Sequence, residues 1–249
     1  NIVLAQDTIS AGLPALFAAR LSGKKFIIRV PGDYVWEQSV QRFGVKDSID
    51  DFQNKKYGFR VEFLRSIQKF VVSNADIVIT PSKYFGTLVS KWVKDPSKIH
   101  VIYNGINLEN PKSQIPNPKQ IPNSKLQTTK NKTIVSVGRL VPWKGFGFLI
   151  ELMKDLPDWK LVIIGDGPEM KNLQLLIANY QLQNRVELTG AVSREKVLEY
   201  LSNAKIFILN TSFESFSFQV VEAMSLGIPV ITTNIGNLSE IIENGVDGI

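Results

Sequence analysis

Apolar runs alternate with segments of helical spacing throughout the second half of the chain. The runs predict strands, and the segments between them, where apolar residues recur every three or four positions, predict helices. Strands that alternate with helices pair in parallel through right-handed crossovers. The pattern therefore predicts a doubly wound α/β domain. The predicted strands are residues 133–137, 160–164, 186–188, 205–209 and 229–232, and the predicted helices are about residues 145–156, 168–180, 194–202, 216–226 and 238–243.

The first half shows the same alternation with fewer repeats, so we assign residues 1–108 to a partial Rossmann-like domain. Residues 109–132 are rich in Pro, Asn, Gln and Lys, which predicts a linker or extended loop before the second domain at residues 133–249. Because the chain opens inside a strand pattern and ends without a closing helix, we interpret it as a portion of a longer protein. The first-half strands are predicted at residues 1–6, 25–30 and 76–82, with a strand and turn at residues 100–107, and the helices at residues 8–21, 58–73 and 82–92.

Composition excludes several kinds of chemistry. The 249 residues contain no cysteine and one histidine, His100, which rules out disulfides and makes zinc sites and histidine-based triads untenable. No apolar run approaches the roughly 20 residues that span a bilayer, and no signal-peptide pattern opens the chain, so we expect a cytoplasmic protein. The net charge of +6 indicates anionic partners such as nucleotides, nucleic acid or an anionic membrane face. A basic surface that serves solubility alone is an equal alternative.

One stretch of the second domain, residues 206–224, reads as strand, turn and helix. Glu214 falls in the predicted turn and Glu222 inside the predicted helix. A helix that begins near Phe216 places Glu222 about 9 to 12 Å along its axis from the turn, about the span of a diphosphate with a sugar at each end. Unpaired amides of Ser215, Phe216 and Ser217 can hold an anion between two carboxylates that accept bonds from sugar hydroxyls. The alternative is an exposed helix with two surface glutamates.

Two cations follow the first strand of the second domain. Arg139 and Lys144 lie where the carboxyl end of that strand is expected to face a cleft. Arginine grips phosphate oxygens in a fork, and lysine acts as a point charge. Gly138 lets the backbone approach a ligand, and Gly165 follows the next strand in a similar place, although a plain turn also explains it. Two surface cations around a loop are the alternative.

Three segments together resemble the donor-binding half of the family 4 glycosyltransferases, retaining enzymes of the GT-B fold. The segments are Ser136-Val137-Gly138-Arg139-Leu140-Val141-Pro142-Trp143-Lys144-Gly145, the stretch from Asn210 to Met224, and Ala223-Met224-Ser225-Leu226-Gly227-Ile228-Pro229-Val230-Ile231-Thr232-Thr233. The resemblance covers residues 133–249 closely and residues 1–107 more loosely. It implies two Rossmann-like domains that face a cleft, and transfer of a sugar from a nucleotide-diphosphate sugar to a saccharide or lipid-linked acceptor.

The resemblance also implies roles for individual residues. Arg139 and Lys144 clamp the diphosphate, Glu222 binds the ribose of the nucleotide, and Glu214 binds hydroxyls of the donor sugar. Retention of the anomeric configuration is implied by the family and not by the residues. Metal-dependent transferases commonly use an Asp-x-Asp sequence, and this chain contains none, so we expect transfer without a metal ion or other cofactor. Nucleic acid is not an expected partner.

The first domain departs from the family pattern. A loop that often carries a histidine near the donor sugar and acceptor reads Val30-Pro31-Gly32-Asp33 here. Asp33 is therefore a candidate catalytic residue that hydrogen-bonds an acceptor hydroxyl, with Tyr34 or Trp36 stacking on a sugar; alternatively, Asp33 caps the next helix. The predicted helix at residues 58–73 carries Arg60, Arg65 and Lys69 outside its apolar face. Such a helix can lie peripherally on the anionic inner face of a membrane, or pack on the sheet.

Three other classes of protein remain to be weighed. A glycoside hydrolase also uses two carboxylates, which lie about 5 to 5.5 Å apart in retaining enzymes and about 6.5 to 9.5 Å apart in inverting ones. The spacing expected between Glu214 and Glu222 is at or beyond the upper end of these ranges. A nicotinamide-dependent oxidoreductase would carry Gly-x-Gly-x-x-Gly after a strand, and the chain has none. A non-catalytic nucleotide-sugar binder stays open, because binding residues alone do not prove turnover.

Overall fold

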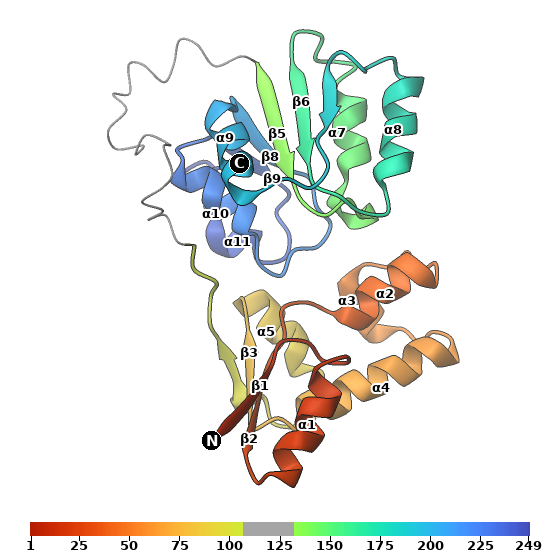
Figure 1. Cartoon of the computed structure of the whole chain (residues 1–249), viewed down its shortest axis with the longest axis vertical. Helices are drawn as coiled ribbons and strands as arrows, with labels where there is room; N and C mark the ends of the chain where they lie inside the picture. Colours follow the sequence, from red (N-terminus) through yellow and green to blue (C-terminus); the bar gives the residue numbers. More distant parts are fainter. Residues whose placement is uncertain (107–131) are drawn as a thin grey trace. The chain divides into compact units, whose positions relative to one another are not determined.

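The computed structural model describes residues 1–106 and 132–249, which form two compact units, Asn1–Asn104 and Gly105–Ile249 (Figure 1). Each unit is an α/β structure with a parallel sheet, as the sequence predicts. Of the predicted linker, only Lys132 lies among the described residues.

The first unit is built on a four-stranded parallel sheet in the order β1-β2-β3-β4. Apolar residues of β2 and β3 form its centre, where Ile28 lies opposite Val78 and both side chains are fully buried. Burial on both faces is typical of a parallel sheet that helices cover. The strands are β1 (Ile2–Ala5), β2 (Lys25–Arg29), β3 (Ile77–Thr80) and β4 (Ile99–Val101).

Short polar side chains cap several helices of this unit at their first turns. Asp33 accepts a hydrogen bond from the amide of Trp36 at the start of α2, and Ser82 accepts one from the amide of Phe85 at the start of α5. α1 packs on β1 and β2, and α4 packs on α1 and α2. The helices are α1 (Gly12–Leu21), α2 (Tyr34–Arg42), α3 (Ile49–Asn54), α4 (Phe59–Ser73) and α5 (Lys83–Ser90), with a 3₁₀ turn η1 (Pro96–Lys98) before β4.

The second unit is built on a five-stranded parallel sheet in the order β7-β6-β5-β8-β9. β5 is central, and the chain turns from one side of it to the other between β7 and β8. Ligands of doubly wound sheets bind outside the carboxyl ends of the strands at such a switch point. The strands, close to the predicted ranges, are β5 (Thr133–Val137), β6 (Lys160–Ile164), β7 (Val186–Leu188), β8 (Ile206–Leu209) and β9 (Val230–Thr232).

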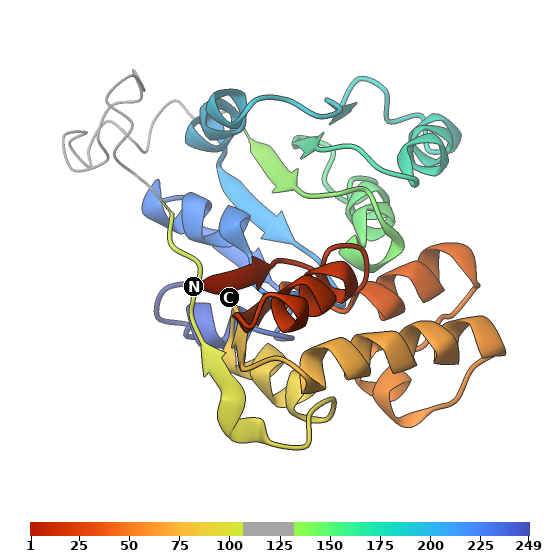
Figure 2. The same cartoon turned by 60° about the horizontal axis from the view of Figure 1, so that its bottom comes forward.

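Helices cover both faces of this sheet, with α7 and α8 on one face and α9, α10 and α11 on the other (Figures 1 and 2). Each face has its own apolar core: Leu140, Ile150 and Ile163 belong to the first, and Phe207, Leu201 and Val220 to the second. The helices are α7 (Phe146–Leu152), α8 (Met170–Asn179), α9 (Arg194–Asn203), α10 (Phe218–Ser225) and α11 (Leu238–Ile241), with a 3₁₀ turn η3 (Pro142–Lys144) after β5.

A substitution at Gly165 tests how closely the loops after β5 and β6 approach each other. Gly165 has φ of +140°, and a Cβ there would lie 2.0 Å from the carbonyl oxygen of Gly138. We expect Gly165→Ala to lower the free energy of unfolding by about 2 kcal/mol or more, measured by urea denaturation. The control is Gly147→Ala in α7, where a Cβ makes an ordinary 3.6 Å contact and stability should be kept or raised. Equal stability of the two variants would contradict the packing described here.

Candidate functional site

Two turns of the second unit are joined through the backbone around Trp143. The first follows β5 and contains η3; the second follows β8. The carbonyl oxygen of Trp143 accepts hydrogen bonds from the amide of Ser212 at 2.7 Å and from the hydroxyl of Thr211 at 3.0 Å. Gly145 has φ of +61°, and a Cβ there would lie 2.2 Å from the carbonyl oxygen of Asn210. The turn that carries the predicted cations therefore packs directly against the turn that carries Glu214.

Lys144 and Glu214 form an ion pair across this contact. Both side chains are nearly buried, with 12% and 11% of their surfaces exposed. A pair removed from water to this degree is screened by salt much less than a surface pair. The structure thus brings together one predicted phosphate ligand and one predicted sugar ligand.

Arg139 lies in the same turn, with its guanidinium over the Trp143 ring, 5.5 Å from the ring centre. This is the range of a cation–π contact. Leu140, the next residue, donates its amide to the carbonyl oxygen of Asp166 at 2.9 Å, so the loop after β6 supports the turn. Gly138 and Gly165 are in backbone contact here, and the contact is possible because Gly165 has no Cβ. A direct contact of either glycine with a ligand stays a prediction.

The helix after β8 begins later than the sequence predicts. α10 starts at Phe218, and its N-cap is Ser217, whose side chain accepts a hydrogen bond from the amide of Val220 at 3.4 Å. Ser215 and Phe216 lie in the loop before the cap, so they are not the first residues of the helix. The serine cap stops the helix from extending backwards, because its extended backbone departs from helical geometry. The amides of the first turn belong instead to Phe218 and Gln219.

Glu222 lies inside α10 and has a partner that sequence reasoning missed. The Nε atom of Arg194 donates to Oε1 of Glu222 at 3.0 Å. The Glu222 side chain is 10% exposed and the Arg194 side chain 48%. Both residues line a pocket whose other walls include Val137, Val192, Val197, Phe218 and Gln219. The sequence does place Arg194 at the start of a predicted helix that follows a strand, which is a position near the expected site. The spacing along the chain, however, does not show that Arg194 contacts Glu222.

The backbone of Glu214 is held from the other side by the residues before α11. Asn237 donates its amide to the carbonyl oxygen of Glu214 at 3.2 Å, and a Cβ on Gly236 would lie 2.3 Å from the same oxygen. The side chain of Asn237 is fully buried, and neither of its polar atoms has a hydrogen-bond partner among the described residues. The sequence did not indicate that these residues contact Glu214, because the two loops come together only in the folded structure.

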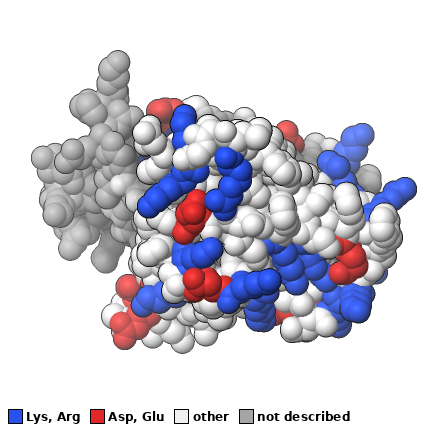
Figure 3. Space-filling view, turned by 90° about the horizontal axis from the view of Figure 1, so that it is seen from below, with Lys and Arg blue, Asp and Glu red and all other residues white. Residues whose placement is uncertain are grey.

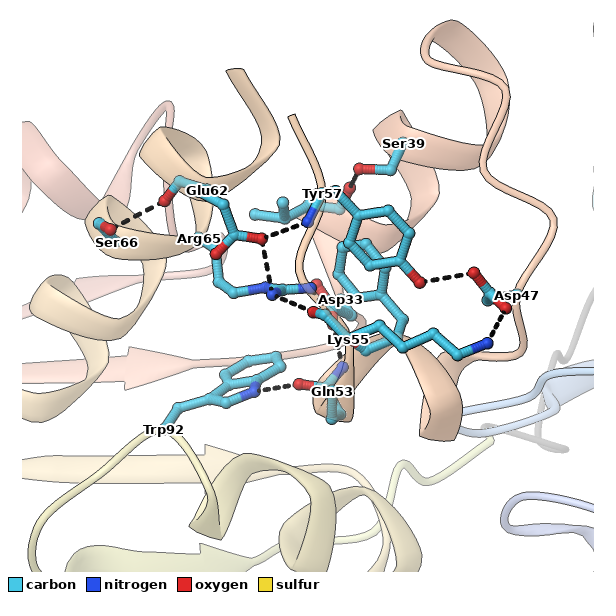
Figure 4. Close-up of polar contacts among 12 residues, drawn as sticks. Asp33, Ser39, Asp47, Gln53, Lys55, Tyr57, Glu62, Arg65, Ser66 and Trp92 are labelled. Atoms are coloured by element: carbon cyan, nitrogen blue, oxygen red, sulfur yellow. Dashed lines mark hydrogen bonds and ion pairs between the residues drawn. The ribbon is translucent and has the colours of Figure 1, made fainter. Parts of the chain in front are cut away.

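Of the two roles that the sequence left open for Asp33, the structure shows the helix cap and not the acceptor ligand (Figure 4). The residue is 1% exposed. Its Oδ1 accepts bonds from the amide of Trp36 and from Nε2 of Gln68, and its Oδ2 accepts one from Nε2 of Gln53. A side chain held in this way does not face an acceptor. Trp36 is also buried and donates its indole N–H to the carbonyl oxygen of Asp47, so stacking on a sugar is excluded for it in this arrangement.

The predicted position of Arg65 in the first unit was wrong. The sequence placed it outside the apolar face of its helix, but it is 8% exposed. Its guanidinium bonds to Glu62 and to the carbonyl oxygens of Phe52 and Lys55, and it lies 4.2 Å from the centre of the Phe52 ring (Figure 4). The aliphatic part of arginine can line a core while its head is paired, so charge alone did not reveal its position.

Burial raises the pKa of Asp33 above its usual value of 3.8, although bonds from Gln68, Trp36 and Gln53 and the charge of Arg65 oppose the change. Between the usual and the raised pKa, the folded protein holds a proton that the unfolded chain has released. We therefore expect the stability of the wild type, relative to Asp33→Asn, to fall as pH rises through this window. Urea denaturation from about pH 4 to about pH 8 measures it, and a difference independent of pH would contradict the prediction.

Lys and Arg side chains gather on the surface seen from below, with fewer Asp and Glu among them (Figure 3). This distribution accords with the net charge of +6. Among the described residues, no helix is both long and apolar enough to cross a bilayer. Contact with an anionic membrane remains a prediction.

Comparison with protein families gives two matches that together cover most of the chain. A model described as Glycosyl transferases group 1 matches residues 118–249, and a model described as Glycosyltransferase Family 4 matches residues 1–110.

Two curated relatives illustrate the similarity. The phosphatidylinositol N-acetylglucosaminyltransferase GPI3 subunit of Saccharomyces cerevisiae is 29% identical over 73% of this chain and 41% of its own length. The 2-deoxystreptamine N-acetyl-D-glucosaminyltransferase of Niallia circulans is 27% identical over 79% of this chain and 51% of its own length. The chain thus spans about half or less of these relatives.

Among solved structures, Anabaena Alr3699/HepE in complex with UDP-glucose superposes with a TM-score of 0.74 at 20% identity, over 99% of this chain and 64% of that one. Sucrose-phosphate synthase from Thermosynechococcus elongatus gives a TM-score of 0.73 at 20% identity, over the whole of this chain and 59% of that one. At this identity the similarity shows the fold, which is the GT-B type expected from the sequence.

Proposed function

We propose a function on one premise: the chain belongs to the family described as Glycosyl transferases group 1, whose model matches more than half of it. The protein moves a sugar from a nucleotide-diphosphate sugar to a saccharide or lipid-linked acceptor. The second unit binds the donor. The names of the relatives, two of which are N-acetylglucosaminyltransferases, favour an N-acetylhexosamine as the sugar, and the UDP-glucose complex favours uracil as the base.

The observation that carries this proposal is the junction of the two turns after β5 and β8. Lys144 and Glu214, which come from sequence segments 70 residues apart, meet as a nearly buried ion pair at the switch point of the sheet. A departing diphosphate gains negative charge, and a preorganised cation in a site poor in water stabilises that charge more in the transition state than in the ground state. A carboxylate beside the cation accepts bonds from hydroxyls of the sugar.

The roles of the remaining residues follow from this placement. Arg139 offers planar donors to phosphate oxygens from the same turn as Lys144. Glu222 accepts hydroxyls of the nucleotide ribose. Since the two cations neutralise the diphosphate, we propose that transfer needs no metal ion. Glu214 and Glu222 are paired with different cations on different elements, which argues against the facing pair of acids that a glycoside hydrolase requires.

Nucleotide binding tests the donor site. We expect calorimetry to detect UDP, GDP or ADP binding to the wild type, and Glu222→Ala to weaken the best of these by about tenfold to a hundredfold, because a bond to a charged group is lost. Glu151→Ala is the control, since Glu151 pairs with Lys154 on the exposed surface of the same unit. Unchanged affinity in Glu222→Ala would remove Glu222 from the ribose site.

Turnover separates an enzyme from a non-catalytic binder. We expect Lys144→Ala and Arg139→Ala to lower kcat for transfer from a radiolabelled donor by about a hundredfold or more, because charge on the leaving group is then less well stabilised. The variant Lys154→Ala, at an exposed pair in the same unit, should retain wild-type kcat. A wild-type protein that binds a nucleotide-sugar and turns over none would establish the binding-only alternative.

Stereochemistry tests the reaction course. We propose retention through attack by the acceptor on the same face that the diphosphate leaves, with a diphosphate oxygen taking the acceptor proton. Proton NMR of the first product formed should show the anomeric configuration of the donor. An inverted product would refute this course.

A further inference from the structure

The ion pair between Arg194 and Glu222 differs from the surface pairs of the second unit. It connects two helices, α9 and α10, through residues 28 positions apart. The carboxylate end is nearly buried, whereas the guanidinium end reaches solvent. On α9 itself, the pair of Lys196 and Glu199 is a contrast, because it lies within one helical turn and both side chains are about half exposed. Exposed pairs of that kind contribute little to stability, so a pair with one buried end calls for a different explanation.

The pair lies in a pocket with two kinds of wall. Val137 at the end of β5, Val192 and Val197 are apolar, while Arg194, Gln219 and Glu222 are polar. Val192 and Val197 flank Arg194 in the sequence, so one segment supplies both a guanidinium and an apolar surface. Pockets that place a few polar groups among apolar side chains fix the orientation of a small ligand. An aromatic base and the hydroxyls of a ribose together match such a pocket.

We propose that Arg194 is a positioning residue for the nucleotide, acting by holding the Glu222 carboxylate toward the ribose hydroxyls. This inference rests on the proposed function. The bond from Nε to Oε1 fixes the carboxylate, which has about four acceptor positions and can therefore accept ribose hydroxyls while it remains bonded to Arg194. Without the guanidinium, the carboxylate loses its ion-pair partner and its orientation. The ribose hydroxyls of the nucleotide then contribute less to the binding affinity.

The experiment measures how strongly the protein prefers a ribonucleotide to its 2′-deoxy form. Calorimetry is done with the nucleoside diphosphate among UDP, GDP and ADP that binds the wild type most tightly, and with the 2′-deoxy form of the same compound. The proteins are the wild type, Arg194→Ala, Arg194→Lys and the control Lys196→Ala. A thermal melt of each variant reports whether it is folded.

We expect the wild type to bind the ribonucleotide about tenfold more tightly than the 2′-deoxy form. Arg194→Ala should lose about tenfold in affinity for the ribonucleotide, and its preference should fall close to one, because the 2′-deoxy form has less to lose. Arg194→Lys should restore part of the preference, and Lys196→Ala should keep all of it. In turnover assays, Arg194→Ala should raise KM for the donor and leave kcat nearly unchanged.

Three results would overturn the inference, and they differ in what they say of the proposed function. If Arg194→Ala keeps the wild-type affinity and preference, or loses affinity equally for both compounds, Arg194 does not act on the ribose and the donor site still stands. If the wild type binds none of the three diphosphates, both the inference and the proposed function fail.

Discussion

The hydrogen bonds on the carbonyl oxygen of Trp143 hold the candidate site together. They join the turn after β5 to the turn after β8, and the absence of a side chain on Gly145 lets the two backbones touch. The nearly buried pair of Lys144 and Glu214 depends on that contact, because a lysine on a free loop would remain in water. The site is therefore a property of the junction between two strand ends.

Further layers support this junction. The loop after β6 accepts the amide of Leu140, and the residues before α11 hold the carbonyl oxygen of Glu214. Close approach at Gly165 and Gly236 leaves no room for a Cβ at either position. The loops after β6 and β9 thus fix the turns that carry Lys144 and Glu214, and fixed turns of this kind are what electrostatic stabilisation of a leaving group requires. The side-chain amide group of Asn237 is buried in this support and has no hydrogen-bond partner among the described residues, which is a destabilising arrangement.

In the first unit, two charged residues, Asp33 and Arg65, serve packing. Asp33 is bonded by two glutamines and a backbone amide, and Arg65 lies against Phe52 with its donors on backbone carbonyls. Both residues are buried. Charged groups in such positions are stable only when other groups pair with them, so the cluster orders α2, α3 and α4 around it.

The sequence by itself determined the parallel α/β architecture, since the ranges of β5, β6 and β7 follow directly from apolar runs between helical segments. It also singled out Lys144, Glu214 and Glu222 as candidate ligands, because their segments resemble a known family. The sequence did not show that Arg194 pairs with Glu222, that Arg65 is buried, or that α10 begins at Phe218. Periodicity and spacing act along the chain, whereas these features depend on contacts between residues far apart in sequence. Only the tertiary structure, which brings the strand ends to one edge of the sheet, decided them.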